Sequence, residues 1–264
     1  MNINIITLFP EIFDSLKYGL LGQALDRGDI KVSIFNLRDH QINKHGQVDD
    51  KPYGGGEGMV LMAEPLEDAI KKISKDNIGK VINLSPQGTL LSQQKAKELS
   101  TLKNITILCG RYEGIDERLI SQYVDEEISI GDYILSGGEF AALTLVDTLS
   151  RFIPGVIGNK KSVEQDSLSQ GLLKGPVFTR PETFNSDGVP EVLISDDHNK
   201  IKEWRDNQSL IRTFKRRPDL LRNIKLTKKQ KNSWKNCHLR LSCSTFQALT
   251  YERYKRYKEK RLFF

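Results

Sequence analysis

The sequence lacks a hydrophobic run long enough to cross a bilayer. The nearest candidate, Phe140 to Val146, is too short and is soon followed by Asp147 and Arg151. The first residues, Asn2 to Leu8, have neither the basic start nor the small-residue cleavage site of a signal peptide. We therefore expect a protein that stays in the cytosol and has no membrane partner.

Cysteine is scarce as well. The chain has three, Cys109, Cys237 and Cys243, and no two of them form a C-x-x-C pair. An odd count without that spacing indicates reduced thiols and argues against both a disulfide framework and a zinc site, so we predict no metal ligands. Cys109 lies within an apolar strand pattern and is expected to be a small core residue.

Two common nucleotide-binding motifs are missing. No G-x-G-x-x-G follows the first expected strand, and no G-x-x-x-x-G-K-[ST] phosphate loop occurs. The sequence therefore gives no support to a nucleotide-dependent oxidoreductase or a nucleoside triphosphatase. Its 264 residues and 38% hydrophobic content suffice for one large or two ordinary globular domains.

Positive charge is concentrated near the end of the chain. Residues 1–200 contain 21 basic and 29 acidic side chains, a net charge of −8, whereas residues 201–264 contain 19 basic and 5 acidic ones, a net charge of +14. Such a basic region favours a polyanion partner such as nucleic acid. A solvated basic helix or tail explains the charge equally well.

Strand-length apolar runs alternate with helical patterns from residue 1 to about 155. This order predicts an α/β fold with a mostly parallel sheet. The strand candidates are Ile3–Leu8, Val32–Leu37, Val81–Leu84, Ile105–Cys109 and Ile128–Ile134. The helix candidates are Ile12–Leu25, Leu66–Ile73, Ala96–Leu102, Ile115–Val124 and Phe140–Phe152.

Three of the expected strands end in glycine-bearing segments. These are Leu84–Gly88, Cys109–Gly114 and Ile130–Gly138, the last of which leads into an apolar helix pattern that begins at Glu139. Ligands of parallel sheets bind beyond the carboxyl ends of the strands. The three segments therefore predict one cleft that holds a flat cofactor against backbone.

A second part of the chain follows a polar stretch. Residues 158–171 are expected to be a flexible linker between a domain of residues 1–157 and a domain of residues 172–264. Residues Val192–Ile194 are a short strand candidate, and His198–Asn223 has helical spacing with Pro218 placed to open a further helix. We expect a small helical domain with a basic tail.

Three further features could carry chemistry. Asp49–Met59 has four glycines in five positions and is expected to be a functional loop. Arg151 and Asp166 stand on either side of the start of the linker. Taken alone, an arginine at a helix end serves the helix dipole and a lone aspartate in a linker is solvated.

Several motifs occur in one order along the chain. They are I-x-T-L-F-P-E-I-F, V-D-D-K-P-Y-G-G-G-E-G-M, L-S-P-Q-G, C-G-R-Y-E-G-I-D-E-R, I-G-D-Y-I-L-S-G-G-E, R-F-I-P-G-V, D-S with G-L-L-x-x-P-x-[FY]-T-R-P, and R-x-F-K-R-R-P-D-L-L. Over about residues 1–225 the chain thus closely resembles the bacterial tRNA (guanine-N1-)-methyltransferases of the SPOUT class. That family has an α/β fold with a deep C-terminal trefoil knot, a rare exception among protein chains.

The resemblance also implies a cofactor, partners and site residues. It implies a homodimer whose active sites are shared between subunits, and a magnesium requirement with unknown ligands. It implies S-adenosylmethionine bound in a bent form by Leu84, Pro86, Gly88, Gly110, Tyr112, Glu113, Ile130, Gly131, Asp132, Tyr133, Ile134, Leu135, Gly137 and Gly138.

The reaction implied by the resemblance is methyl transfer to N1 of the guanosine at position 37 of tRNA. Asp166 matches the family's proposed general base and Arg151 its companion, suited to stabilise negative charge at O6. The alternatives are a methyltransferase of this fold acting on a different RNA base, and a catalytically silent RNA-binding protein. Two residues depart from the family's pattern: Lys174 stands where an acidic residue is common, and Asp196 where glycine is usual.

Overall fold

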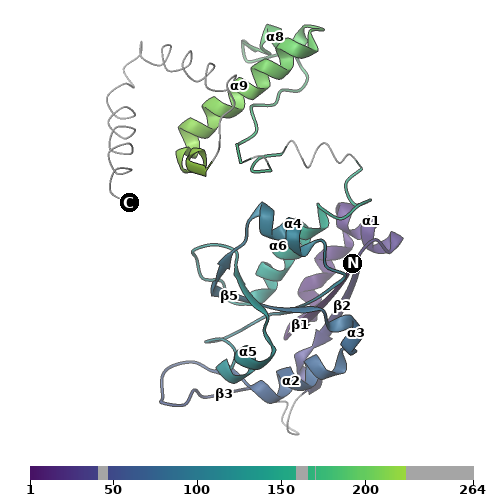
Figure 1. Ribbon diagram of the computed structural model, residues 1–264, viewed down its shortest axis with the longest axis vertical. Helices are drawn as coiled ribbons and strands as arrows, with labels where there is room; N and C mark the ends of the chain where they lie inside the picture. Colours follow the sequence, from purple (N-terminus) through teal and green to yellow (C-terminus); the bar gives the residue numbers. More distant parts are fainter. Residues whose placement is uncertain (41–46, 159–165, 170, 224–264) are drawn as a thin grey trace. The chain divides into compact units, whose positions relative to one another are not determined.

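The computed structural model describes residues 1–40, 47–158, 166–169 and 171–223. The chain divides into two compact units, Met1–Val163 and Glu164–Phe264 (Figure 1). Cys237, Cys243 and the basic tail lie outside the described residues. Within those residues, no helix is long and apolar enough to span a membrane.

The first unit is built on a parallel five-stranded sheet. Its strand order is β2-β1-β6-β5-β7, and all four neighbouring pairs run in the same direction. The strands are β1 (Asn2–Thr7), β2 (Lys31–Asn36), β5 (Lys80–Leu90), β6 (Asn104–Leu108) and β7 (Glu126–Ser129). The predicted α/β class with a mostly parallel sheet is therefore confirmed.

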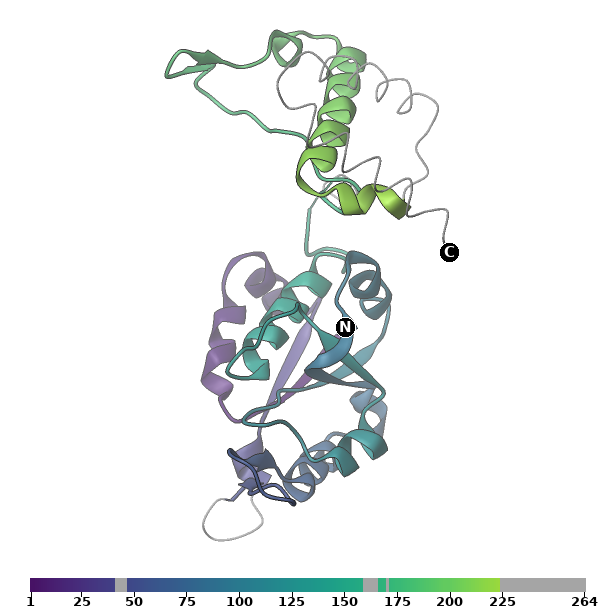
Figure 2. The same cartoon turned by 90° about the vertical axis from the view of Figure 1, so that its left-hand side faces the viewer.

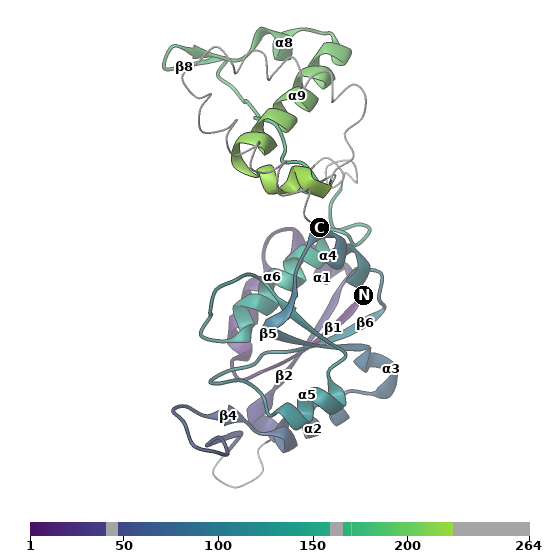
Figure 3. The same ribbon diagram turned by 60° about the vertical axis from the view of Figure 1, so that its left-hand side comes forward.

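Helices cover both faces of this sheet (Figures 1 and 3). One face carries η1 (Pro10–Lys17), α1 (Gly19–Arg27), α4 (Gln93–Leu99) and α6 (Gly138–Ser150). The other face carries η2 (Leu37–His40), α2 (Ala63–Lys72) and α5 (Glu117–Tyr123), beside the short α3 (Lys75–Ile78). Each face of the sheet packs against its helices in a separate hydrophobic core. Alternate residues of β1 belong to the two cores, with Ile3 and Ile5 in one and Ile6 in the other.

Several predicted elements have different bounds in the structure. The predicted helix Ile12–Leu25 is two helices, because Tyr18 is extended and Gly19 has a φ of 67°. The predicted strand Ile128–Ile134 is wrong beyond Ser129, where β7 ends. Its neighbour β5 ends at Leu90, paired with Ser129, and offers no further strand to continue the ladder.

The segment Leu84–Gly88, predicted to follow a strand, lies inside one. Leu84 and Thr89 of β5 both align with Ile128 of β7, so the four residues between them form an irregular excursion within β5. A Cβ on Gly88 would lie 2.3 Å from the carbonyl carbon of Glu127, so only glycine permits this close approach.

A short hairpin stands beside the sheet. It pairs β3 (Asp49–Asp50) with β4 (Val60–Leu61) and encloses the glycine-rich loop. Gly54, Gly55, Gly56 and Gly58 all have positive φ angles, a conformation that other residues rarely adopt.

The second unit is organised around α9 (His198–Arg216), followed by η3 (Pro218–Asn223), as the helical spacing and Pro218 predicted (Figure 2). The predicted strand Val192–Ile194 is wrong. These residues belong to the single-turn helix α8 (Glu191–Ile194), whose N-cap is Pro190. The unit also has a small hairpin of β8 (Thr183–Phe184) and β9 (Asp187–Gly188).

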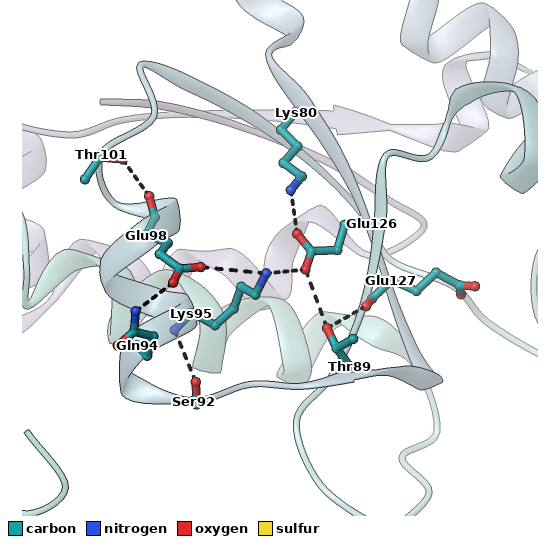
Figure 4. A network of polar contacts seen from close by, with 9 residues as sticks. All are labelled: Lys80, Thr89, Ser92, Gln94, Lys95, Glu98, Thr101, Glu126 and Glu127. Atoms are coloured by element: carbon teal, nitrogen blue, oxygen red, sulfur yellow. Dashed lines mark hydrogen bonds and ion pairs between the residues drawn. The ribbon is translucent and has the colours of Figure 1, made fainter. Parts of the chain in front are cut away.

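A network of charged side chains ties β5, α4 and β7 together (Figure 4). Both oxygens of the Glu126 carboxylate accept from lysines at 2.6 Å, one from Lys80 and the other from Lys95. Burial favours the neutral form of Glu126, but the hydrogen bonds from these lysines outweigh burial and hold its pKa below the ordinary glutamate value.

We expect Glu126→Gln to lower the free energy of unfolding by about 1–3 kcal/mol at pH 7, because charge-assisted hydrogen bonds are lost. A lowered folded-state pKa stabilises the protein above the unfolded-state value of about 4.3, and this contribution is lost as the pH falls through the folded-state pKa. The difference from wild type should therefore narrow below about pH 4.

Urea unfolding followed by circular dichroism measures this effect. Tryptophan fluorescence does not report on the first unit, since Trp204 and Trp234 both belong to the second. Glu98→Gln is the matched control, because the Glu98 carboxylate lies 3.9 Å from Lys95 and is 54% exposed. Equal losses in the two variants would contradict the assignment.

Candidate functional site

Of the three predicted cofactor segments, two follow β6 and β7 and the third lies within the last part of β5. β6, β5 and β7 are adjacent and parallel, so their carboxyl ends lie side by side. The residues Gly110, Tyr112 and Glu113 follow β6, and Ile130–Leu135 follow β7. Leu84, Pro86 and Gly88 belong to the irregular part of β5. The structure thus brings these residues to one edge.

The residues at the two ends of the segment between β7 and α6 are each bonded to a neighbouring segment. On one side, the amide of Leu91 donates to the carbonyl of Ser129 at 2.7 Å. On the other side, the amide of Gly138 donates to the carbonyl of Gly110 at 2.8 Å. A Cβ on Gly138 would lie 2.8 Å from Cα of Cys109, so a side chain there would push the two segments apart. Packing against Cys109 therefore requires glycine at position 138, which the motif had marked as a cofactor-binding residue.

The residues Ile130–Leu135 form a tight loop. The Ser129 hydroxyl contacts both the amide and the carbonyl of Gly131, and the Tyr133 amide donates to the Gly131 carbonyl at 2.9 Å. Gly131 has a φ of 155°, and a Cβ there would lie 2.3 Å from the Tyr133 ring. The loop exposes much of its apolar surface, with Ile134 81% and Tyr133 56% accessible.

A buried carboxylate holds these segments in place. Glu139, in the first turn of α6, has no solvent-exposed side-chain surface. It accepts a hydrogen bond from the Thr7 hydroxyl at the end of β1 and one from Arg111 Nε after β6, each at 2.9 Å. Arg111 also donates to the Ser136 carbonyl at 3.1 Å, and its guanidinium lies 4.5 Å from the centre of the Phe9 ring.

This network was not predicted. Its residues are distant in sequence: Glu139 is 132 residues from Thr7 and 28 residues from Arg111. The sequence signal that could have indicated it is Glu139, a charged residue at the start of a mainly apolar helix pattern. Next to this network, Gly137 precedes α6, and a Cβ there would lie 2.2 Å from Arg111 Nε. Gly137 therefore leaves room for the arginine.

Cys109 is a core residue, as predicted. Burial raises the pKa of its thiol, and the nearby Glu139 carboxylate adds to the effect. Its thiol therefore stays protonated at neutral pH and is a packing group.

The glycine-rich hairpin lies against the segment after β6. The Glu113 amide donates to the Met59 carbonyl at 2.9 Å, and the Leu61 amide donates to the Gly114 carbonyl at 2.9 Å. A Cβ on Gly58 would lie 2.7 Å from Cγ of Glu113. The functional role of this loop stays a prediction, and the structure places the loop next to one of the predicted cofactor segments.

The two predicted catalytic residues belong to different units. Arg151 is the half-buried C-cap of α6, in the first unit. Asp166 belongs to the second unit, where one carboxylate oxygen lies 3.5 Å from Nζ of Lys174. In the described part of the chain, no three His, Cys, Asp or Glu side chains converge as metal ligands.

Comparison with known proteins identifies the family. The family model described as tRNA (Guanine-1)-methyltransferase TrmD matches residues 1–223. The chain belongs to this family. A tRNA (guanine-N(1)-)-methyltransferase from Pseudoalteromonas translucida is 53% identical over 86% of this chain and 91% of its own length. Proteins of the same name from Pseudoalteromonas atlantica and Clostridium novyi are 52% and 48% identical, over 86% and 88% of this chain and 86% and 95% of theirs.

We expect Glu139→Gln to destabilise the first unit by about 3–5 kcal/mol, because Arg111, whose side chain is only 17% exposed, loses its counter-charge. Thr7→Val removes only a neutral donor and should cost about 1 kcal/mol. Urea unfolding by circular dichroism ranks the two variants. Hydrogen exchange should also speed up in residues 110–114 and 130–138 of Glu139→Gln. A Glu139→Gln protein as stable as wild type would show that the network does not hold the loops.

Proposed function

We propose that the protein transfers the methyl group of S-adenosylmethionine to N1 of the guanosine at position 37 of tRNA. The observation that carries the proposal is the family match over residues 1–223 together with intact glycines at all three cofactor segments. The ordered motifs cover the RNA-facing segments as well as the cofactor segments, which favours this target over another RNA base. A silent RNA-binding protein would have no need for Asp166, Arg151 and these glycines together.

The edge of the sheet suits S-adenosylmethionine. Backbone groups of Gly110–Glu113 and Ile130–Leu135 can hydrogen-bond the adenine edge, while exposed apolar side chains such as Ile134 can cover its ring. Gly88, Gly137 and Gly138 allow the close main-chain packing that the segments need. When bound, the cofactor supplies an electrophilic methyl group. We assign its binding to the residues named from the resemblance.

The proposed chemistry of the chain is proton removal and charge stabilisation. N1 of neutral guanine carries a proton, so a base must take this proton before the nitrogen lone pair becomes available. Asp166 accepts the proton, and the Arg151 guanidinium stabilises the negative charge that develops on O6. Positioned proton transfer contributes roughly 10²- to 10⁴-fold in rate.

We further propose that the first unit has the knotted SPOUT fold. The return of residues 136–138 over the segment after β6, where Arg111 and Gly137 form an isolated bridge, supports this topology. The domain scheme of residues 1–157, a linker of 158–171 and an RNA-binding domain of 172–264 is proposed with it. The boundary between the compact units falls within that linker.

The active form is proposed to be a homodimer with shared sites. Large apolar side chains near the start of α6 are exposed in the single chain, including Ile134 and Phe140 at 81% and 54%. A second copy could cover this surface. The magnesium requirement implied by the resemblance stays part of the proposal, and we assign no residue to the ion.

Asp166→Ala should keep the affinity for S-adenosylmethionine near wild type and lower single-turnover methylation at least a hundredfold, since only the proton acceptor is lost. Calorimetry and a labelled-methyl assay with unmodified tRNA transcripts measure the two quantities. Asp196→Ala removes an exposed carboxylate of the same unit and should leave both near wild type. Unchanged methylation by Asp166→Ala would remove this residue from its role.

Arg151→Ala should reduce the single-turnover rate more than it reduces tRNA affinity, because charge on O6 develops only in the transition state. Filter binding and rapid-quench kinetics give the two values, and Arg38→Ala controls for the loss of an exposed arginine in the same unit. A loss confined to affinity would make Arg151 a phosphate contact.

A further inference from the structure

Lys174 lies beside the proposed general base. Its Nζ is 3.5 Å from Oδ1 of Asp166, and the two side chains are 49% and 36% exposed. At this distance the two charges attract each other, so Lys174 balances the negative charge of the Asp166 carboxylate.

The backbone around Lys174 is well anchored. Upstream, the Leu168 amide donates to the Leu172 carbonyl at 2.8 Å, and the Lys174 amide donates to the Ser167 hydroxyl at 3.0 Å. Immediately before Lys174, Leu173 is fixed to α9: its amide donates to the Thr213 hydroxyl at 2.9 Å, and its carbonyl accepts from the Ser209 hydroxyl at 2.6 Å. The Lys174 side chain thus extends from a fixed point.

The ion pair itself is easily exchanged. Exposed pairs of this kind contribute little to stability and are screened by salt. The second unit carries 22 basic and 12 acidic residues, a net charge of +10, so a polyanion is drawn toward it. A lysine is a point charge that binds phosphate well. An RNA phosphate that approaches Asp166 would compete with its carboxylate for Lys174.

We propose that Lys174 is a contact for a backbone phosphate of tRNA, held by Asp166 until RNA arrives. Binding moves the ammonium group from the carboxylate to the phosphate, so Asp166 gives up this counter-charge when its substrate is present. The proposal rests on the proposed function, because it takes tRNA as the substrate.

Binding of an unmodified tRNA transcript to the full chain at pH 7, over a salt series, tests the exchange. Lys174→Met should weaken binding and reduce the slope of log K against log salt by about 0.7–0.9, the loss of one phosphate contact. An unchanged slope would overturn the proposal.

A double-mutant cycle provides the second test. Asp166→Asn should tighten tRNA binding about 2- to 5-fold more in the wild-type background than in the Lys174→Met background, because only the former has the Lys174–Asp166 ion pair to break. Lys200→Met is the matched control: Lys200 pairs with Asp197 at 3.2 Å and should show no coupling with Asp166→Asn. Equal tightening in all backgrounds would mean simple relief of repulsion and would contradict the exchange.

These measurements separate this inference from the proposed function. Failure of Asp166 as the base would appear in single-turnover methylation and leave the binding cycle unchanged. Failure of the exchange would appear in the binding cycle alone. A protein that does not bind tRNA at any salt concentration would refute both.

Discussion

The buried carboxylate of Glu139 is the constraint on which the edge of the sheet depends. A carboxylate removed from water is costly unless charged and hydrogen-bonding partners surround it. Its two partners come from the end of β1 and from the segment after β6, at 2.9 Å each. Because Glu139 itself opens α6, three parts of the chain that are distant in sequence are fixed to one carboxylate. A shift of Arg111 would leave the buried charge unpaired, and a shift of Thr7 would remove one of its two hydrogen bonds.

The glycines around this network follow from the same constraint. Arg111 must reach Glu139 past the main chain of Gly137, and a Cβ at that position would occupy the space of its guanidinium. Gly138 lies so close to Cys109 that its amide can bond the carbonyl of Gly110. A Cβ on either glycine would therefore collide with the segment after β6. The motifs from which a ligand site was predicted thus also describe a packing arrangement.

Sequence periodicity predicted correctly those elements whose conformation depends on local preference and on burial in the core. β1 and β6 were predicted within one residue at each end, because their side chains are buried under helices on both faces and read as apolar runs. The edge strand β2 was predicted equally well from Val32, Ile34 and Phe35, although it is only partly buried. Periodicity failed where strand pairing or tertiary contact determines the secondary structure. Ile130–Ile134 is apolar enough for a strand, but in the described part of the chain no strand pairs with it beyond Ser129, and none lies beside Val192–Ile194. The Glu139 network could not be predicted, since its partners meet only in the folded chain.

The proposal assigns cofactor binding to the first unit and the general base to the second, and this assignment has an energetic basis. Alignment of two reactants can contribute about 7–11 kcal/mol to a rate, whereas a positioned base contributes roughly 10²- to 10⁴-fold, about 3–5 kcal/mol. Alignment needs rigidity, and the cofactor segments have it through Glu139 and the close glycine contacts. Proton transfer tolerates a base on an exposed segment whose charge is balanced by Lys174. With Asp166 as the proposed base, only the smaller contribution, proton transfer, depends on the second unit. Substrate binding would then determine when the base acts.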